Sequence, residues 1–365
     1  MIAPRALVLC VLFILAVMAL PGCASMTNKA PDDEASVLFC GDVMLDWGVK
    51  ELFLSEGYDY PLKRIRQFFS GFDARFCNLE CPISDKGDPH PEKKYIFIAP
   101  PGAARILAYG GISGVSLANN HAMDFGSAAL ADTIAVLAKH GIAAAGAGAD
   151  VEKARIPVQL ELKGTKLAVL CYTNTGNKEA YATKTTPGIA RAGIEIIRRD
   201  VQALRKSGAV VVVSLHWGDE YADYPSAEQV ELAHDIIDAG ADAIIGHHSH
   251  IYQGVELYKG KPILYSLGNF LFGSINEEIR DNIVVALRLK KGVPAFLEIY
   301  PVNGSQDSSH RFQPRRITGS HAQALLRHLL DISKPLDPEF PKRALLRDSM
   351  ISCDLRANIP PASEK

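Results

Sequence analysis

Short apolar runs alternate with longer amphipathic segments along this chain, and no other feature restricts its fold as strongly. Runs rich in β-branched or apolar residues predict strands at 37–39, 74–77, 114–117, 167–172, 210–215, 243–245 and 263–266. Between several of them, segments 127–140, 192–207 and 227–239 carry apolar residues on one helical face, and each is followed by glycine, the usual residue just past a helix end. Such alternation predicts an α/β protein.

The last third of the chain departs from this alternation. Segments 282–289 and 295–300 flank Lys290–Lys291–Gly292 and predict an antiparallel hairpin, so we expect a mixed sheet system. We expect the main domain to span 37–303 and a C-terminal extension to span 304–365. The extension contains one short predicted helix at 321–330, and we expect its proline-rich remainder to cover the surface or to be disordered.

Composition sets broad limits on function. The chain has 365 residues, of which 48% are hydrophobic and 22% charged, as in ordinary globular proteins. Its net charge is −2, so no basic excess favours a nucleic-acid partner, and we expect none.

The first 23 residues predict an export signal. The apolar run at 6–20 follows Arg5 and is shorter than the roughly 20 residues that a membrane span needs, as in a signal peptide. Leu20–Pro21–Gly22–Cys23 is similar to a bacterial lipobox, in which Cys23 would carry the lipid, although Pro21 departs from the usual residue. An uncleaved N-terminal anchor is the alternative. Both predict an extracytoplasmic, membrane-anchored protein with a polar tether at 24–36.

Most of the remaining cysteines lie in predicted strands. Cys40, Cys77 and Cys171 occur in apolar runs, where a free cysteine behaves as a small hydrophobic residue. We therefore expect them to be buried and free. Disulfides are the alternative in such a compartment.

Polar side chains follow five of the predicted strands, at the point where each strand ends. They are Asp42; Asn78 and Glu80; Asn119, Asn120, His121 and Asp124; His216 and Glu220; and His247, His248 and His250. Because ligands collect outside the carboxyl ends of strands in α/β sheets, we expect these residues to converge. Carboxylates, amide oxygens and imidazoles suit Mn²⁺, Fe²⁺ or Zn²⁺. The sequence therefore predicts a site for one or two divalent ions.

These motifs, in this order, resemble the CapA family of capsule synthesis proteins, also called poly-γ-glutamate biosynthesis proteins, within the calcineurin-like metallophosphoesterases. The resemblance covers about 37–272. It rests on Gly41–Asp42–Val43–Met44, Asn78–Leu79–Glu80, Ala118–Asn119–Asn120–His121–Ala122–Met123–Asp124, Lys94–Tyr95–Ile96–Phe97–Ile98–Ala99–Pro100–Pro101, His216–Trp217–Gly218–Asp219–Glu220, Gly246–His247–His248–Ser249–His250 and Tyr265–Ser266–Leu267–Gly268–Asn269–Phe270. It implies a metallophosphoesterase-like, four-layer α/β/β/α sandwich with two mixed sheets flanked by helices.

The resemblance also implies roles for individual residues. The implied metal ligands are Asp42, Glu80, Asn120, His216, His248 and His250, and the implied catalytic histidine is His121. The superfamily's first motif is Asp-x-His, but Met44 stands at the place of that imidazole, which puts the first of two metal positions in doubt. His247 stands where the superfamily has glycine or a small residue, so it is an additional imidazole.

Further residues are expected to support catalysis or substrate binding. Asp124 is expected to contact His121 or to cap the helix near Ser127, and the resemblance favours the first. Glu220 is expected to orient a ligand or transfer a proton, or else to be a solvated carboxylate. The expected substrate contacts are Asn78, Lys94, Tyr95, Trp217 and Asn269, with Lys93 beside them and Trp47 where many relatives carry arginine.

Three functions fit this pattern. The resemblance implies a membrane-tethered protein of capsule or exopolymer biosynthesis, working with a capsule-synthesis complex, whose metal site hydrolyses a phosphoester or a γ-glutamyl amide of an anionic substrate. The second function is a non-catalytic assembly or export subunit, which the substitution at Met44 keeps open. The third is a general extracytoplasmic phosphoesterase, for which an intact Asp-x-His motif would be expected.

Overall fold

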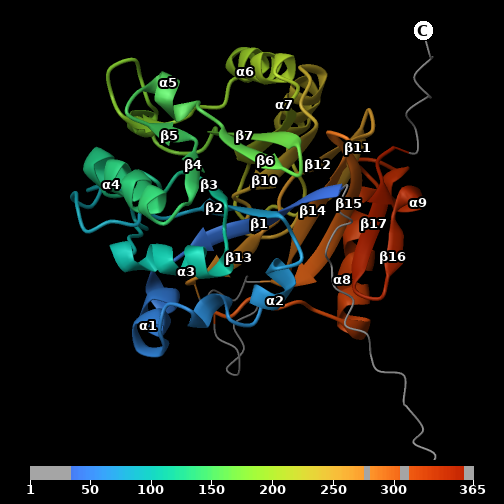
Figure 1. The fold of residues 1–365 in the computed structure, drawn as a ribbon, viewed down its shortest axis with the longest axis horizontal. Coiled ribbons are helices and arrows are strands. Elements are labelled where there is room, and N and C mark those ends of the chain that lie inside the picture. Colours follow the sequence, from blue (N-terminus) through green and yellow to red (C-terminus); the bar gives the residue numbers. More distant parts are fainter. Residues whose placement is uncertain (1–33, 275–279, 305–311, 357–365) are drawn as a thin grey trace, which may run out of the picture.

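Two large β-sheets form the centre of this computed structural model, which describes residues 34–274, 280–304 and 312–356 (Figure 1). The first sheet contains β1 (Glu34–Met44), β2 (Ala74–Leu79), β3 (Gly114–Ser116), β4 (Ala143–Ala145), β13 (Asn269–Phe272), β14 (Asn282–Lys290), β15 (Val293–Val302), β16 (Leu345–Arg347) and β17 (Met350–Asp354). The second contains β6 (Val158–Leu162), β7 (Thr165–Thr173), β9 (Val210–His216), β10 (Ala243–His247), β11 (Val255–Tyr258) and β12 (Lys261–Leu264). A small ribbon pairs β5 (Ala147–Gly148) with β8 (Gly188–Ile189).

Both large sheets are mixed. The nine-stranded sheet has the order β16-β17-β15-β14-β1-β2-β3-β4, with β13 pairing with β1 off this path. In it, β1 is parallel to β2 and β13 but antiparallel to β14. The six-stranded sheet has the order β11-β12-β10-β9-β7-β6, and its central strands β7, β9, β10 and β12 are parallel. The carboxyl ends of the parallel strands therefore meet at one edge in each sheet.

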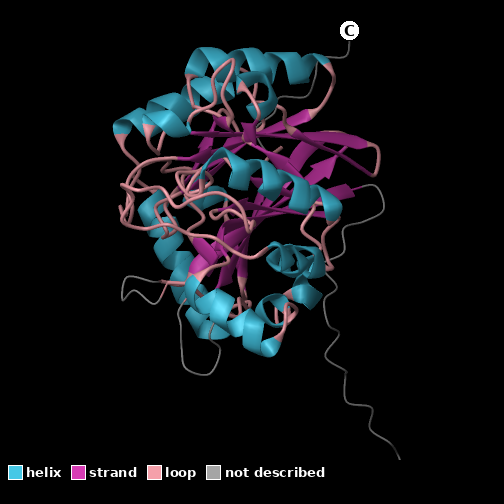
Figure 2. Cartoon of the chain, turned by 90° about the vertical axis from the view of Figure 1, so that its left-hand side faces the viewer, coloured by secondary structure: helices cyan, strands magenta, loops and turns pink. Residues whose placement is uncertain are grey.

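Helices surround the two sheets (Figure 2). They are α1 (Trp47–Glu56), α2 (Arg66–Phe69), α3 (Ala104–Gly110), α4 (Gly126–Lys139), α5 (Val151–Ala154), α6 (Ile194–Lys206), α7 (Ala227–Asp238), α8 (Gly319–Ser333) and α9 (Phe340–Arg343), with short 3₁₀ turns η1 (Tyr60–Leu62), η2 (Pro101–Ala103) and η3 (Lys178–Ala180). Helices α1, α3 and α4 contribute to the core beside the nine-stranded sheet, and α6 and α7 to the core beside the six-stranded sheet.

The strand sequences explain this layering. Val37 and Phe39 of β1 face the core between the sheets, whereas Leu38 and Cys40 face the outer core, because successive side chains in a strand point to opposite faces. In β9, Val212 likewise faces the other sheet. Strands buried on both faces read as continuous apolar runs, which is why their positions are predictable. The structure confirms the four-layer α/β/β/α sandwich with two mixed sheets.

The C-terminal extension differs from the expectation. Strand β17 pairs antiparallel with β15, with Ile351 opposite Ile299, and β16 pairs with β17. Helix α8 packs Leu326 and Leu329 into the core between the sheets. The prediction that the remainder beyond the 321–330 helix covers the surface or is disordered is therefore wrong for 345–354, because alternate apolar residues there extend the sheet.

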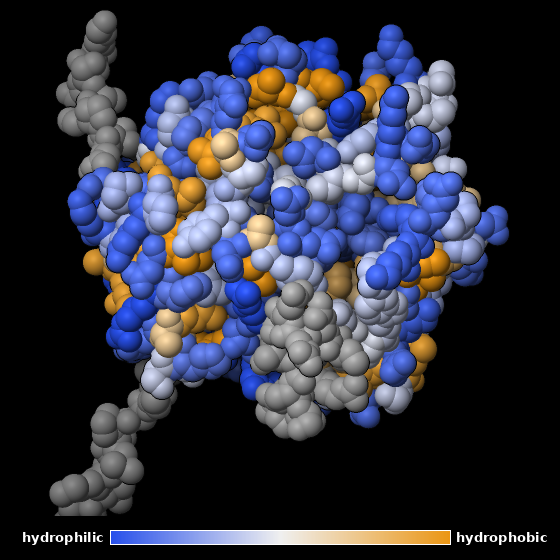
Figure 3. Space-filling view, turned by 180° about the vertical axis from the view of Figure 1, so that it is seen from behind, coloured by the Kyte–Doolittle hydropathy of each residue, from blue (hydrophilic) through white to orange (hydrophobic). Residues whose placement is uncertain are grey.

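Other predictions concern the chain ends, the cysteines and the surface. The predicted signal, Cys23 and most of the tether lie outside the described residues. The five cysteines within the described part, Cys40, Cys77, Cys81, Cys171 and Cys353, are buried and free. Across the described ranges, no helix combines the length and the apolar character that crossing a bilayer requires. Seen from behind, the surface is largely hydrophilic, with apolar residues in separate patches (Figure 3).

Candidate metal centre

The carboxyl ends of strands from both sheets bring the predicted polar residues together. From the nine-stranded sheet, Asp42 lies near the end of β1 and Glu80 directly follows β2. From the six-stranded sheet, His216 is the last residue of β9, and His248 follows β10. The sheets stack with these ends adjacent, so residues far apart in sequence share one buried centre.

The loop after β10 is strained in a way that directs its imidazoles. His248 has φ +93° and His250 has φ +60°, both in the left-handed region that non-glycine residues seldom adopt. Strain of this kind concentrates at functional sites. The preceding Gly246 has no room for a side chain, since a Cβ there would lie 1.9 Å from the carbonyl oxygen of Tyr265.

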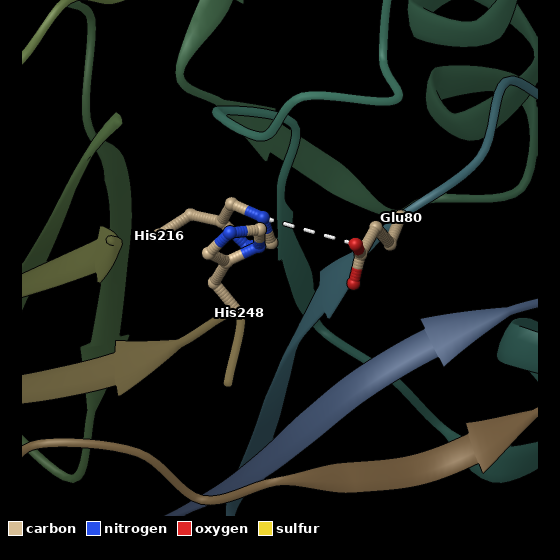
Figure 4. Close-up of side chains that lie close together, drawn as sticks. All are labelled: Glu80, His216 and His248. Atoms are coloured by element: carbon tan, nitrogen blue, oxygen red, sulfur yellow. Dashed lines mark ion pairs between the residues drawn. The ribbon is translucent and has the colours of Figure 1, made fainter. Parts of the chain in front are cut away.

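Glu80, His216 and His248 form the first group of side chains able to hold an ion. One ligand atom from each lies within 4.8 Å of the others, and all three residues are buried. The two imidazoles extend from the ends of neighbouring strands toward the Glu80 carboxylate (Figure 4), with His216 Nε2 3.7 Å from Glu80 Oε1. The amide oxygen of Asn120 lies 2.8 Å from His216 Nε2, so Asn120 adds a fourth donor.

Asp42, Glu80 and His250 form a second group by the same criterion, and Glu80 belongs to both. The Asn78 amide donates to Oδ1 of Asp42 (2.8 Å), and the backbone N–H of His248 donates to Oδ2 (3.2 Å). The exposed Glu220 forms a third group with His248 and His250, at the solvent side. Glu220 therefore lies within reach of the imidazoles of His248 and His250.

The polar atoms of this centre lack the partners that buried groups normally have. Among the described residues, neither carboxylate oxygen of Glu80 has a hydrogen-bond partner, and Nδ1 of His248 has none. A buried group left unpaired in this way is unfavourable, and a missing ion is one explanation of it. Since imidazole and carboxylate are the ligands of Mn²⁺, Fe²⁺ and Zn²⁺, the donor set fits a divalent metal.

Burial and mutual repulsion shift the titration of these groups. Burial, with added repulsion from Asp42 and Glu220, holds the pKa of Glu80 well above its usual range. Burial and the neighbouring imidazoles lower the pKa of His248 to about 3 and that of His216 well below its usual value. Burial opposes ionisation of Asp42, but contacts with His247, His250 and Asn78 outweigh it and lower its pKa. His216 and His248 are therefore neutral near pH 7, the form that binds metal.

His121 lies beside the ligand Asn120 and is oriented by a buried carboxylate. Its Nδ1–H donates to Oδ2 of Asp124 (2.7 Å), so Asp124 contacts His121, and the residue preceding α4 is Phe125, which makes no side-chain cap. Lys93 forms an ion pair with Asp124 and donates to the backbone carbonyl of Asn120 (2.5 Å). Burial is the main cause that lowers the pKa of His121. Of Lys93 and Lys94, it is Lys93 that contacts residues of the site.

The expected substrate contacts divide into buried and exposed residues. Trp217 is 1% exposed and donates from Nε1 to the carbonyl of Tyr265, so it packs in the core, and its contact with a substrate stays a prediction. Asn78 and Asn269 are buried as well, and Asn269 accepts from Nδ1 of His250 (2.9 Å), so both hold ligand side chains. Their contact with a substrate stays a prediction.

Lys94 and Tyr95 lie at the surface, next to an aromatic row that leads to His121. Lys94 Nζ lies 4.8 Å from the ring centre of Tyr95. The Trp47 ring lies 6.1 Å from that of Tyr95 and 5.0 Å from that of Phe97, which in turn contacts His121 at 4.2 Å. Sequence reasoning did not single out Phe97 as a site residue, because nothing in a strand-like run indicates contact with a distant histidine.

Comparison with known proteins identifies the family. The model of the bacterial capsule synthesis protein PGA_cap matches residues 36–274. The PGA biosynthesis protein CapA of Bacillus subtilis is 32% identical over 274 residues, which cover 74% of this chain and 72% of that protein. The capsule biosynthesis protein CapA of Bacillus anthracis is 31% identical over 284 residues, covering 76% and 69%.

Solved structures are more distant. A 5′-nucleotidase precursor from Thermus thermophilus aligns with a TM-score of 0.48 at 14% identity, covering 84% of this chain and 60% of that chain. The NAD nucleotidase of Haemophilus influenzae aligns with a TM-score of 0.47 at 13% identity, covering 82% and 56%. Because the family model covers more than half of the chain and two relatives exceed 30% identity, the chain belongs to the bacterial capsule synthesis protein family.

Proposed function

We propose that this protein is a metal-dependent hydrolase of capsule or exopolymer biosynthesis, of the poly-γ-glutamate type. The observation that carries the proposal is the Glu80 carboxylate, which is fully buried, lacks a hydrogen bond among the described residues and belongs to two ligand groups. A buried ionised carboxylate is costly unless it is paired or bound to metal. Glu80 is therefore suited to bridge two divalent ions, or to bind one.

The two ligand groups define which residues would hold metal. Glu80, Asn120, His216 and His248 form the more complete position, and Asp42 and His250 complete the second with Glu80. A divalent ion such as Mn²⁺, Fe²⁺ or Zn²⁺ would supply Lewis-acid polarisation of the scissile group.

His121 is placed to transfer a proton. Because Asp124 accepts the Nδ1–H of His121, the opposite nitrogen Nε2 is the one free to take up a proton from the attacking water and to pass it to the leaving group. Lys93 holds Asp124 and the Asn120 backbone, which keeps the imidazole and a ligand in fixed relation. In this proposal His121 acts as the acid–base group, and Asp124 and Lys93 are positioning residues.

The names of the relatives support a γ-glutamyl substrate. The Mycobacterium tuberculosis relative is a probable polyglutamine synthesis accessory protein, 29% identical over 285 residues that cover 65% of this chain and 74% of that protein. The exposed Lys94 and Tyr95 are suited to contact an anionic polymer at the surface end of the aromatic row that leads to His121. We therefore propose a γ-glutamyl amide as the bond cleaved, with a phosphoester as the second candidate.

A non-catalytic assembly or export subunit is the alternative function, and Met44 favours it. Its side chain is fully buried, and its sulfur accepts the N–H of Asp46 at 3.2 Å, so it adds no ligand to the Asp42 position. A centre reduced in this way is suited to hold metal or polymer without turnover.

We also propose that the protein is exported and anchored outside the cytoplasm by lipid on Cys23, where it works with a capsule-synthesis complex. The apolar run at 6–20 and the sequence Leu20–Pro21–Gly22–Cys23 support the anchor. Labelling cells with a radioactive fatty acid would test it, with Cys23→Ser as the variant expected to lose the label. Label retained in that variant would contradict the anchor.

The experiment that tests the function combines metal analysis with turnover. The full chain in detergent is incubated with Mn²⁺ or Zn²⁺, desalted, analysed for bound metal and assayed on γ-glutamyl and phosphoester substrates. We expect bound metal in the wild type, a large loss in His248→Ala, and no loss in the control His140→Ala, whose imidazole bonds the Val136 carbonyl at a helix end. A metal-free wild type would refute the proposal, and metal without turnover would support the assembly role.

A further inference from the structure

His247 lies against the proposed metal centre but belongs to none of its three ligand groups. It is the last residue of β10 and only 1% exposed. Its Nδ1 lies 3.2 Å from Oδ1 of Asp42. Among the described residues, neither of its ring nitrogens makes a hydrogen bond of regular geometry. A buried imidazole without regular partners calls for an explanation.

The Asp42 position is the less complete of the two. Its three ligand candidates are Asp42, Glu80 and His250, whereas the other position adds Asn120 to Glu80, His216 and His248. Met44 offers nothing in place of an imidazole, because its sulfur accepts the Asp46 N–H within the outer core. Binding at the Asp42 position therefore depends on how firmly Asp42 itself is oriented.

The two oxygens of Asp42 have different surroundings. Oδ2 lies 3.7 Å from Nδ1 of His250 and accepts the His248 N–H, so it faces the ligand loop. Oδ1 accepts from the Asn78 amide and faces His247 Nδ1. Since Asn78 belongs to the nine-stranded sheet and His247 to the six-stranded sheet, Oδ1 has a neighbouring nitrogen from each sheet.

We propose that His247 is a positioning residue. It orients Asp42 through Oδ1, the oxygen that does not face the ligand loop, and thereby lets the second metal position bind an ion although Met44 supplies no imidazole. The proposal rests on the proposed metal centre. Residues that orient a metal ligand typically affect metal affinity by about 10- to 100-fold. The additional imidazole thus serves Asp42 and does not bind the ion directly.

The test compares two variants of similar size in the full chain. His247→Met removes the donor, whereas His247→Gln keeps an N–H donor on a side chain of similar length. Mn²⁺ alone is titrated by calorimetry, and the spectrum of bound Mn²⁺ is recorded by electron paramagnetic resonance. Retention of the tighter ion, held by His216 and His248, shows that a variant is folded.

We expect two ions and a spin-coupled spectrum in the wild type. In His247→Met we expect one tight ion, a second weakened by about 10- to 100-fold and a mononuclear spectrum, and in His247→Gln substantial recovery of the second ion. Equal binding in all three proteins, an equal loss in both variants, or a single ion in the wild type would overturn the role of His247. A wild type that binds no Mn²⁺ would refute the proposed metal centre itself.

Discussion

Replacement of Glu80 by methionine should change stability in opposite directions with and without metal. The side chain is fully buried, and neither carboxylate oxygen has a hydrogen-bond partner in the described structure. A buried unsatisfied polar group costs about 1–3 kcal/mol. In the metal-free protein, Glu80→Met should therefore raise the free energy of unfolding by about that amount, or the melting temperature by roughly 2–6 °C.

The gain should grow with pH. Burial raises the pKa of Glu80 in the folded protein above the usual value of 4.5. The native state therefore keeps a proton that the unfolded chain releases, so the contribution of Glu80 to the stability of the metal-free wild type is lost as pH rises from about 4.5 toward the raised pKa. Glu80→Met lacks this dependence. Its advantage should be smallest near pH 4 and larger near pH 7.

Bound metal should make the wild type more stable than Glu80→Met. An ion at a free concentration of 100 times its Kd stabilises the wild type by about 2.7 kcal/mol. Glu80→Met should gain little of this, since Glu80 belongs to both principal ligand groups. Calorimetric melting in EDTA and in Mn²⁺ measures both effects.

Glu256 provides the matched control. It is also a buried carboxylate, but it pairs with His234 (2.6 Å) and accepts from the Tyr265 hydroxyl (2.7 Å). Glu256→Met should therefore destabilise the protein with or without metal, because it leaves His234 and the Tyr265 hydroxyl without their hydrogen-bond acceptor. If Glu80→Met destabilises the metal-free protein as Glu256→Met does, or keeps the full response to Mn²⁺, the reasoning about Glu80 is wrong.

Three further predictions concern catalysis and pH. Lys93→Met should lower kcat by a smaller factor than the whole contribution of acid–base catalysis, which is about 10²- to 10⁴-fold. Lys93→Arg should recover part of the lost kcat. Unchanged steady-state kinetics in Lys93→Met would contradict the positioning role of Lys93. Trp47→Ala should raise KM for a γ-glutamyl polymer by about 2- to 10-fold and leave kcat nearly unchanged, since one aromatic contact contributes about 0.5–1.5 kcal/mol; a loss confined to kcat would exclude a binding role. The metal-free protein should lose stability as pH falls below about 6.5, because the unfolded chain gains protons at His216 and His248 that the native state excludes, each contributing up to about 1.4 kcal/mol per pH unit. Urea unfolding at pH 7 and pH 5 measures this, and His248→Asn should show a weaker dependence than the wild type.

Local sequence was sufficient where one physical cause dominates. The central strands were predictable because residues such as Val37 and Val212 are buried on both faces of their sheets and leave continuous apolar runs. Helix ends were predictable where glycine follows, as Gly141 follows α4. Strand β13 was not, because Asn269 reaches its place by parallel pairing with the distant Asp42.

The sequence by itself determined the chemistry of the centre: carboxylates, amides and imidazoles at strand ends, with Met44 in place of one imidazole. The tertiary structure alone decided which of them meet. Stacking the two sheets sets Glu80 opposite His216 and His248. Packing on the outer face of the six-stranded sheet buries Trp217, and the paths of two loops bring Lys93 to Asp124. These outcomes depend on sheet order and loop path, which non-local pairing controls and residue type does not reveal.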